Sequence, residues 1–217
     1  MNSQIDLSAF ASTNLPTRYG QFKVTVFRNG IDGKEHLVIQ IGEIGNGKDI
    51  TVRMHSACLT SEVLGSLKCD CREQLENALK DIAEKGRGVV IYLRQEGRGI
   101  GLGNKIRAYA LQEQGYDTVE ANHILGFEDD LRDYRVAGQI LDYLGVKSVN
   151  LLTNNPRKIA GLKESGISVM KRIPLQIEPN PLNIEYLKTK TAKSGHLLNF
   201  GSKREIVNLN RAESHEN

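Results

Sequence analysis

Three cysteines in one short span are the residues of this chain best suited to chemistry. Cys58, Cys69 and Cys71 are all the cysteines among its 217 residues. Three thiolates leave one position open on a tetrahedral Zn²⁺ ion, and water bound at an open position is converted to hydroxide near neutral pH. An odd cysteine count also argues against a disulfide framework. The spacing therefore predicts a metal site of the hydrolytic kind.

Two other interpretations of the cysteines remain open. Free cysteines often act as small buried apolar residues, although clustering beside Lys68 and Asp70 makes this the weaker interpretation. Alternatively, His55 or His123 could be a fourth ligand, which would close the site and make it structural. Spacing alone does not separate an open site from a closed one.

A glycine-rich loop, RQEGRGIGLGNK, follows the apolar run VVIYL and precedes a helical pattern. Its glycines allow the backbone to approach a ligand closely, and Arg98 and Lys105 add positive charge that suits a polyphosphate. The loop is not a phosphate-binding Walker A motif, because Asn104 precedes the lysine and Ile106 follows it. It also lacks the dinucleotide fingerprint GxGxxG. By itself the loop is a weak signal.

Composition and charge exclude several classes of protein. The formal net charge is only +3, and the basic stretch 94–107 contains no aromatic residue for base stacking, which disfavours a nucleic-acid-binding zinc module. The chain has no apolar run near the roughly 18 residues that a membrane span needs. Its first residues lack the features of a signal peptide. We therefore expect a cytoplasmic enzyme without a membrane or nucleic-acid partner, whose three thiols stay reduced.

Periodicity predicts an α/β fold with a mixed sheet, in which an N-terminal antiparallel β-meander is followed by alternating helices and strands. The meander comprises FKVTVF, HLVIQI and ITVRMHS. Later strands are GVVIYLRQ, SVNLLTN and ISVMKRI, and the helices are an amphipathic stretch ending at Gly86, then NKIRAYALQEQ, DYRVAGQILDYL and PRKIAGLKES. We expect ligands at the turns that leave the strands.

Four long segments are similar to GTP cyclohydrolase II: RMHSACLTSEVLGSLKCDC, RQEGRGIGLGNKIRAYALQEQGYDTVEAN, LGFEDDLRDY and LLTNNPRKI. The resemblance implies an N-terminal extension over residues 1–17, one catalytic domain over 18–198 and a flexible tail over 199–217. It also implies hydrolysis of GTP to 2,5-diamino-6-(5-phospho-D-ribosylamino)pyrimidin-4(3H)-one, formate and diphosphate, the first step of riboflavin biosynthesis. One catalytic Zn²⁺ per subunit, Mg²⁺ on the phosphates and a homodimer are implied as well.

The resemblance assigns roles residue by residue. It implies Cys58, Cys69 and Cys71 as zinc ligands. It implies Asp130 as proton acceptor, Arg132 as nucleophile and Tyr109 as a residue of purine-ring hydrolysis. The implied GTP contacts are Arg53, Met54, His55, Ser56, Ala57, Gln74, Glu96, Gly97, Arg98, Thr118, Thr153 and Lys158.

Several of these roles have alternatives. A guanidinium with a pKa above about 12 has no free lone pair at neutral pH, so Arg132 is equally explained as a bidentate phosphate clamp. Thr118 and Thr153 could be turn or cap residues. A rival enzyme would stop after ring opening and leave a formamidopyrimidine nucleotide, and Tyr109 is the residue that the resemblance sets against it.

Overall fold

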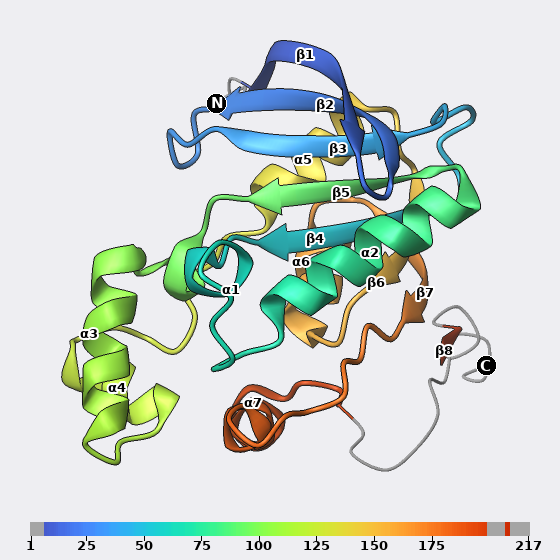
Figure 1. Ribbon diagram of the computed structural model, residues 1–217. Helices are drawn as coiled ribbons and strands as arrows, with labels where there is room; N and C mark the ends of the chain where they lie inside the picture. The colour runs from blue at the N-terminus through green and yellow to red at the C-terminus, as the bar shows by residue number, and fades with distance from the viewer. Residues whose placement is uncertain (1–6, 199–206, 209–217) are drawn as a thin grey trace, which may run out of the picture.

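The computed structural model describes residues 7–198 and 207–208. Within these residues, eight strands form one sheet in the order β1-β2-β3-β5-β4-β6-β7-β8 (Figure 1). The strands are β1 Leu7–Thr17, β2 Gly20–Asn29, β3 His36–Ile41, β4 Ile50–Ser56, β5 Gly88–Leu93, β6 Ser148–Leu152, β7 Ser168–Ile173 and β8 Val207–Asn208. The helices are α1 Leu59–Glu62, α2 Cys71–Lys85, the short 3₁₀ helix η1 Glu96–Gly99, α3 Leu102–Glu113, α4 Thr118–Ile124, α5 Arg135–Tyr143, α6 Pro156–Glu164 and α7 Ile184–Ser194.

The sheet is antiparallel at one end and parallel in its centre, which confirms the predicted mixed α/β fold. Strands β1, β2, β3 and β5 pair antiparallel in that order, whereas β4 pairs parallel with both β5 and β6. The expected meander is wrong in one strand, because β5 lies between β3 and β4. Six of the seven residues of β4 are buried, a pattern typical of a central parallel strand covered on both faces.

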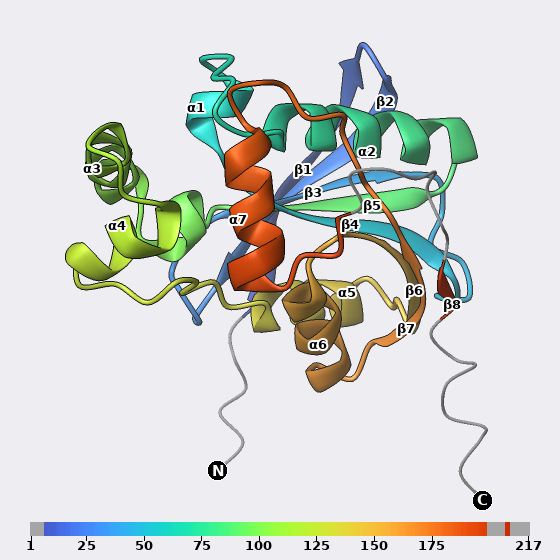
Figure 2. The same ribbon diagram turned by 90° about the horizontal axis from the view of Figure 1, so that it is seen from below.

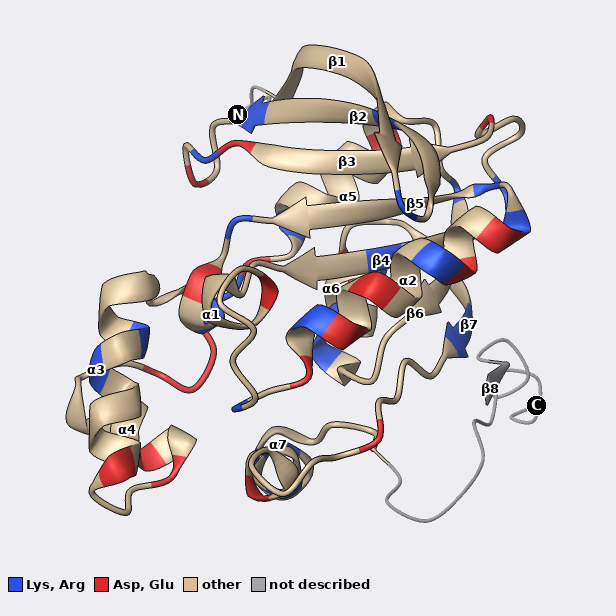
Figure 3. Cartoon of the chain, viewed as in Figure 1, with Lys and Arg blue, Asp and Glu red and all other residues tan. Residues whose placement is uncertain are grey.

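Helices cover both faces of the sheet. In Figure 2, α2 lies on one face, and α5 and α6 lie on the other. The larger core joins α5 to apolar residues of β4, β5 and β6, and the smaller core packs Ala78 and Ile82 of α2 against Phe22 and Val90. Lys/Arg and Asp/Glu residues alternate along the outer side of α2 (Figure 3), as expected for a solvated helix face.

Local sequence signals explain where several helices begin and end. Helix α2 stops at Gly86, whose φ of 65° is left-handed, as the sequence predicted. Helix α6 begins after Asn155, whose side chain accepts a hydrogen bond from the Arg157 amide. Asp117 caps α4 in a capping box with Glu120. Helices α1, α4 and α7 were not predicted.

The two ends of the chain are described in part. The segment expected as an N-terminal extension contains β1, which pairs with β2 along its length. Of the expected tail over 199–217, the described residues are Val207–Asn208, and they pair antiparallel with β7. Among the described residues, no helix combines the length and the apolar character needed to cross a membrane.

Candidate functional site

A cavity lies where the parallel strands β4, β5 and β6 end, the edge at which α/β sheets bind ligands. We call it the central cavity. Turns after these strands supply much of its wall, and α2, α3 and α7 supply the rest. The predicted site residues that line it are Arg53, His55, Ser56, Ala57, Cys58, Cys69, Cys71, Gln74, Glu96, Gly97, Arg98, Tyr109, Arg132, Thr153 and Lys158.

Alternation along β4 decides which of its side chains reach the cavity. Val52 and Met54 point into the large core, and Arg53 and His55 point to the opposite face and line the cavity. The side chain of Met54 is therefore a core residue, and its carbonyl accepts a hydrogen bond of 2.7 Å from Lys158 Nζ. Met54 differs in this way from the other predicted residues of the segment 53–57.

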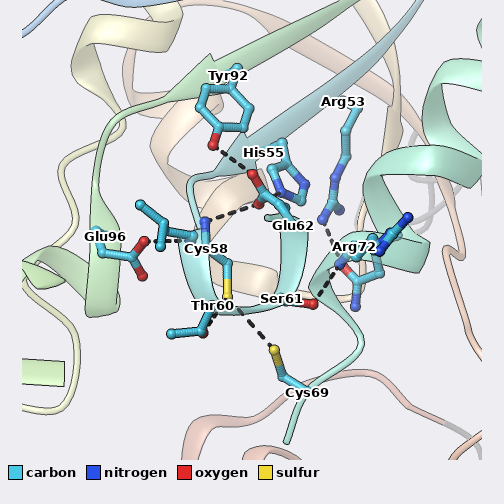
Figure 4. Close-up of polar contacts among 12 residues, drawn as sticks. Arg53, His55, Cys58, Thr60, Ser61, Glu62, Cys69, Arg72, Tyr92 and Glu96 are labelled. Carbon is cyan, nitrogen blue, oxygen red and sulfur yellow. Dashed lines mark hydrogen bonds and ion pairs between the residues drawn. The ribbon is translucent and has the colours of Figure 1, made fainter. Parts of the chain in front are cut away.

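The three cysteines converge at the cavity wall. Cys58 precedes α1, Cys69 lies in the loop before α2, and Cys71 is the first residue of α2. Their sulfur atoms all lie within 4.8 Å of one another, and Cys58 Sγ is 3.7 Å from Cys69 Sγ (Figure 4). Sulfurs this close, on a wall open to a cavity, fit a thiophilic ion such as Zn²⁺.

The thiols share their protons unequally in the absence of a metal. Hydrogen bonds from Cys69 and Cys71 hold the pKa of Cys58 well below its ordinary value, and Lys105, with Nζ 3.1 Å from Cys58 Sγ, lowers it further. Hydrogen bonds to the other sulfurs and burial raise the pKa of Cys71 well above its ordinary value. A divalent cation would remove this competition, because it stabilises all three thiolates.

Neither histidine considered as a fourth ligand belongs to the cluster. Among the described residues the cluster holds the three cysteines and no histidine. His55 Nε2 instead lies 2.8 Å from Glu62 Oε1, and burial lowers the pKa of His55 to about 4. His123 is an exposed residue whose Nε2 lies 2.9 Å from Asp129. This geometry favours the open site over the closed one.

Glu62 organises the backbone around Cys58. Its carboxylate accepts hydrogen bonds from the Cys58 amide at 2.9 Å and from the Tyr92 hydroxyl at 2.5 Å, and it pairs with His55 (Figure 4). Glu96 holds the same segment from the other side, because its Oε2 accepts a hydrogen bond of 2.7 Å from the Leu59 amide. These two carboxylates fix the entry to α1 and with it the position of Cys58.

Buried cations form another part of the cavity wall, which we call the basic wall. Arg53 donates to Gln74 Oε1 at 2.6 Å and to the Leu152 carbonyl at 3.0 Å, and burial lowers its pKa to about 10. Burial, and then Arg53 and Arg132, lower the pKa of Lys158 well below its ordinary value. A buried wall with this excess of positive charge is stabilised by an anionic ligand.

Asp130 and Arg132 form a tight pair at this wall. Arg132 donates from Nε to Oδ1 at 2.7 Å and from Nη2 to Oδ2 at 2.5 Å. Burial opposes charge on Arg132, but Tyr134 and Asp130 raise its pKa above the ordinary value. Burial would also raise the pKa of Asp130, but the hydrogen bonds from Arg132 hold it below its ordinary value. Asp130 itself lies in a small adjoining cavity.

The glycine-rich loop turns sharply into the cavity. Arg98 has a φ of 58°, a left-handed conformation that is rare for a residue with a side chain. Gly97 also has a positive φ, and a Cβ there would lie 3.1 Å from the Lys105 side chain. Strained residues of this kind cluster at ligand-binding sites. Close approach of this backbone to a ligand stays a prediction, and the left-handed Gly97 and Arg98 interrupt the short 3₁₀ segment.

Tyr109 and Thr118 occupy the outer side of the site. Tyr109 of α3 lines both the central cavity and a neighbouring outer cavity, and burial raises its pKa to about 12. Thr118 lines the outer cavity alone. The two cavities share Gly97, Arg98, Lys105, Tyr109 and Tyr186, so they are direct neighbours.

Sequence reasoning missed the contribution of α7. Tyr186, Lys190 and His196 line the central cavity, and Lys190 Nζ lies 3.8 Å from Asp70 Oδ1. No motif marks these residues, because the segment reads as an ordinary polar helix. A weak signal was available in the pair Tyr186 and Lys190, which are four residues apart and so share a helix face.

The arrangement can perform one kind of chemistry well. A three-thiolate site for a Lewis acid and several buried arginines and lysines line one cavity. A protonated phenol, Tyr109, lines the same cavity. Metal-activated water, phosphate stabilisation and proton donation could thus act on one bound molecule.

Comparison with known proteins agrees with this chemistry. A family model described as GTP cyclohydrolase II matches residues 8–174. A riboflavin biosynthesis protein RibBA from Bacillus velezensis is 55% identical over 201 residues, covering 92% of this chain and 49% of that protein. RibBA of Bacillus subtilis is 58% identical over 187 residues (86% and 47%), and RibBA of Endomicrobium trichonymphae is 52% identical over 192 residues (88% and 48%).

The match to these relatives is partial in one respect, since the chain spans about half the length of the curated relatives it matches. Among solved structures, the RibBX two-domain 3,4-dihydroxy-2-butanone 4-phosphate synthase from A. baumannii aligns with 23% identity and a TM-score of 0.45. That alignment covers 77% of this chain and 41% of the other, and a score this low does not bear on the fold.

Proposed function

Because this chain belongs to the GTP cyclohydrolase II family, we propose that it hydrolyses GTP to 2,5-diamino-6-(5-phospho-D-ribosylamino)pyrimidin-4(3H)-one, formate and diphosphate. The relatives are named as riboflavin biosynthesis proteins, so the pyrimidine would enter that pathway. The observation that carries the proposal is the meeting of three cysteine sulfurs and several buried cations in one cavity.

The proposed metal is one zinc ion held by Cys58, Cys69 and Cys71. When bound, it would supply a Lewis acid that makes hydroxide available at neutral pH. The donor set supports zinc, because thiolates prefer soft ions, and because His55 and His123 pair with carboxylates outside the cysteine cluster. Glu62 and Glu96 would keep Cys58 oriented toward the ion through the backbone of α1.

The proposed binding mode places the purine near the cysteines and the phosphates at the basic wall. Arg53, Arg98, Arg132 and Lys158 would offset the charge of the triphosphate, with Mg²⁺ on its oxygens. The outer cavity beside Thr118 leaves room for the base next to Tyr109. The remaining proposed GTP contacts are those predicted from the sequence, with Met54 contributing its backbone and not its side chain.

For Arg132 we favour the clamp over the nucleophile. A guanidinium whose pKa is raised by Asp130 and Tyr134 holds its proton more tightly than a free one, so its nitrogen is a poorer nucleophile. Two hydrogen bonds to one carboxylate also fix the plane of the fork, which suits recognition of a phosphate. Asp130 then acts by orienting Arg132.

Tyr109 is the proposed proton donor in the second hydrolysis, to the formamide nitrogen from which formate departs after the ring has opened. Glu96 is a poorer candidate, because its carboxylate already accepts hydrogen bonds from Lys105, the Gly97 amide and the Leu59 amide. Burial raises the pKa of Tyr109 to about 12, so its hydroxyl is protonated at cellular pH. Removal of this hydroxyl should leave the reaction at the formamidopyrimidine stage.

The test is direct product analysis. Purified protein with zinc, Mg²⁺ and GTP should release formate and diphosphate in equal amounts, measured by coupled enzyme assays, with the pyrimidine identified by mass spectrometry. Cys69→Ala should remove formate release, and Lys80→Ala, on the exposed side of α2, should not. Intact GTP in the presence of stoichiometric bound zinc would refute the proposal.

Tyr109→Phe is the matched test of the proton donor, since it keeps the aromatic ring near Lys68 and Lys105. Formate release should fall at least tenfold, and the formamidopyrimidine nucleotide should accumulate. An unchanged yield of formate would remove Tyr109 from the mechanism.

We also propose that the protein acts in the cytoplasm as a homodimer, with GTP as its small-molecule substrate.

A further inference from the structure

His196 is a histidine inside the site that none of the roles above uses. It follows α7 and lines both the central cavity and the small adjoining cavity that contains Asp130. Its Nδ1 is buried and has no hydrogen-bond partner among the described residues. Buried polar atoms are nearly always paired, so an orphan ring nitrogen in a cavity indicates a missing ligand.

The backbone holds His196 firmly at this position. The His196 amide donates to the Lys190 carbonyl at 3.2 Å, and the next amide, of Leu197, donates to the Asn154 carbonyl at 2.8 Å. The Asn154 side chain in turn exchanges two hydrogen bonds with the Leu175 backbone. The segment after α7 is thereby fixed to the end of β6, and the imidazole has a defined place beside the basic wall.

The groups around His196 are mainly cationic. The two carboxylates that line the small adjoining cavity with it already have cationic or histidine partners, because Asp130 binds Arg132 through both oxygens and Asp129 pairs with His123. Burial, and then the surrounding cations, lower the pKa of His196 to about 3, so the ring is neutral at pH 7 without a ligand. The charged and titratable groups that face it from the neighbouring elements are Lys190, Lys193, Arg98, Asp129, Asp130, Arg132, Arg157 and Lys158.

We propose that His196 binds the phosphate chain of the nucleotide and takes up one proton from solvent as it does so. This inference rests on the proposed function and assigns a new residue to the same site. A polyphosphate brings several negative charges to a wall that is otherwise cationic, which reverses the potential that keeps the imidazole neutral. The charged ring can then donate from both nitrogens, where the neutral ring donates from one.

The sign of the pH dependence follows from proton uptake. The complex binds one more proton than the free protein between the two pKa values of His196. This contribution to affinity is complete below the pKa of the free protein, falls by up to about tenfold per pH unit between the two values, and is lost above the pKa of the complex. His196→Gln, which cannot take up a proton, should lose this component of the pH dependence.

The experiment uses the full zinc-loaded chain with isotope-labelled histidine and inorganic diphosphate plus Mg²⁺ as the probe. The chain has five histidines, and the signal missing in His196→Gln identifies His196. The NMR titration midpoint of that signal should rise from about 3 to about 7 when diphosphate saturates the protein, because a smaller rise would leave His196 neutral between pH 6 and pH 8. An unchanged midpoint with diphosphate bound would overturn the inference.

Affinity gives a second measurement that does not depend on the spectrum. The ratio of the diphosphate Kd at pH 8 to that at pH 6 should be about tenfold larger for the wild type than for His196→Gln, and titration of diphosphate itself cancels in this comparison. His123→Gln, an exposed histidine outside the central cavity, is the control and should behave as the wild type. If His196→Gln does not fold, His196→Asn replaces it.

The outcomes separate this inference from the proposed function. Formate release from GTP together with an unmoved His196 signal would overturn the inference alone. A raised midpoint in a protein that leaves GTP intact would support the inference and refute the proposed function. Equal Kd ratios in the wild type and the variant would also overturn the role of His196.

Discussion

Lys105 shows how a single side chain can link the metal site to the substrate loop. Its Nζ lies 3.1 Å from Cys58 Sγ and 2.7 Å from Glu96 Oε1, so one ammonium group bridges a thiolate and a carboxylate. Three thiolates on a divalent ion leave a net negative charge, and a nearby cation offsets it. Lys105 would therefore make a metal ion held by the cysteines more electron-poor than the cysteines alone would.

The same contact gives a prediction for the metal-free protein. Hydrogen bonds from Cys69 and Cys71, and then the ammonium group of Lys105, hold the pKa of Cys58 well below its ordinary value. Lys105→Met should move the midpoint of Cys58 alkylation to higher pH, so Cys58 in the variant reacts more slowly at pH 6. Peptide mass spectrometry after a short iodoacetamide pulse measures the rate. Lys80→Met on α2 is the control, and equal midpoints in both variants would contradict the role of Lys105.

A second prediction at this scale concerns covalent catalysis by Arg132. If Arg132 is a clamp, intact-mass spectrometry of a rapidly quenched reaction should find no nucleotide attached to the protein. Arg132→Lys should lower the rate of diphosphate release by about a hundredfold or more, because a lysine cannot reproduce the planar fork that Asp130 fixes. A stoichiometric nucleotide adduct on Arg132 would establish the nucleophile instead.

Among the helices and strands, sequence patterns correctly predicted the features that depend on residues close together in the chain. The helices that became α2, α3, α5 and α6 were found because apolar spacing and terminal glycines are local signals. The place of β4 was wrong, since strand pairing depends on contacts distant in the chain. Helix α7 was also missed, and Lys190 of this helix and His196 after it enter the site through tertiary packing that no motif encodes.

The glycine-rich loop gives a testable prediction about how one segment of the chain positions another. Gly99 has a φ of 98°, and a Cβ there would meet the Leu131 backbone at 3.0 Å, in the segment that carries Asp130 and Arg132. Gly101 has a similar φ of 86°, but a Cβ there meets nothing within 4 Å. Alanine substitutions at Gly99 and Gly101 can therefore be compared: both strain the backbone, but only the one at Gly99 would also displace the segment that carries Arg132.

We expect Gly101→Ala to cost about 1 kcal/mol of unfolding free energy, and Gly99→Ala to cost about 2–3 kcal/mol and also to weaken binding of a non-hydrolysable GTP analogue about tenfold. Urea denaturation and calorimetric titration measure the two effects. Equal affinity in both variants would show that the contact with Leu131 does not position Arg132.

For the whole molecule, a bound metal should couple the two ends of the site. Zinc would tie Cys58, which follows β4, to Cys69 and Cys71, which begin α2. A ligand present at about a thousand times its Kd stabilises the native state by about 4 kcal/mol, which corresponds to roughly 10 °C in Tm for a chain of this size. Chelator-treated protein should gain this shift on addition of zinc, and Cys71→Ser should not. An identical Tm with and without zinc would argue against the metal site.

Association is the remaining property of the whole molecule. Val63, Leu64 and Leu67, between α1 and α2, are 72%, 71% and 54% exposed, and we call them the apolar patch. Contiguous exposed apolar residues are typical of protein interfaces. If the patch forms the proposed dimer contact, sedimentation equilibrium at micromolar concentration should give twice the chain mass of 24.1 kDa.

Leu64→Asp should then shift the protein to the monomer mass, because a buried unpaired carboxylate in an interface costs several kcal/mol. Ile124→Asp, at a residue of α4 that is 53% exposed, is the matched control and should remain dimeric. A dimer that survives Leu64→Asp would place the contact elsewhere on the molecule. A monomeric wild type would instead remove association from the proposal, and the apolar patch would then require a different partner.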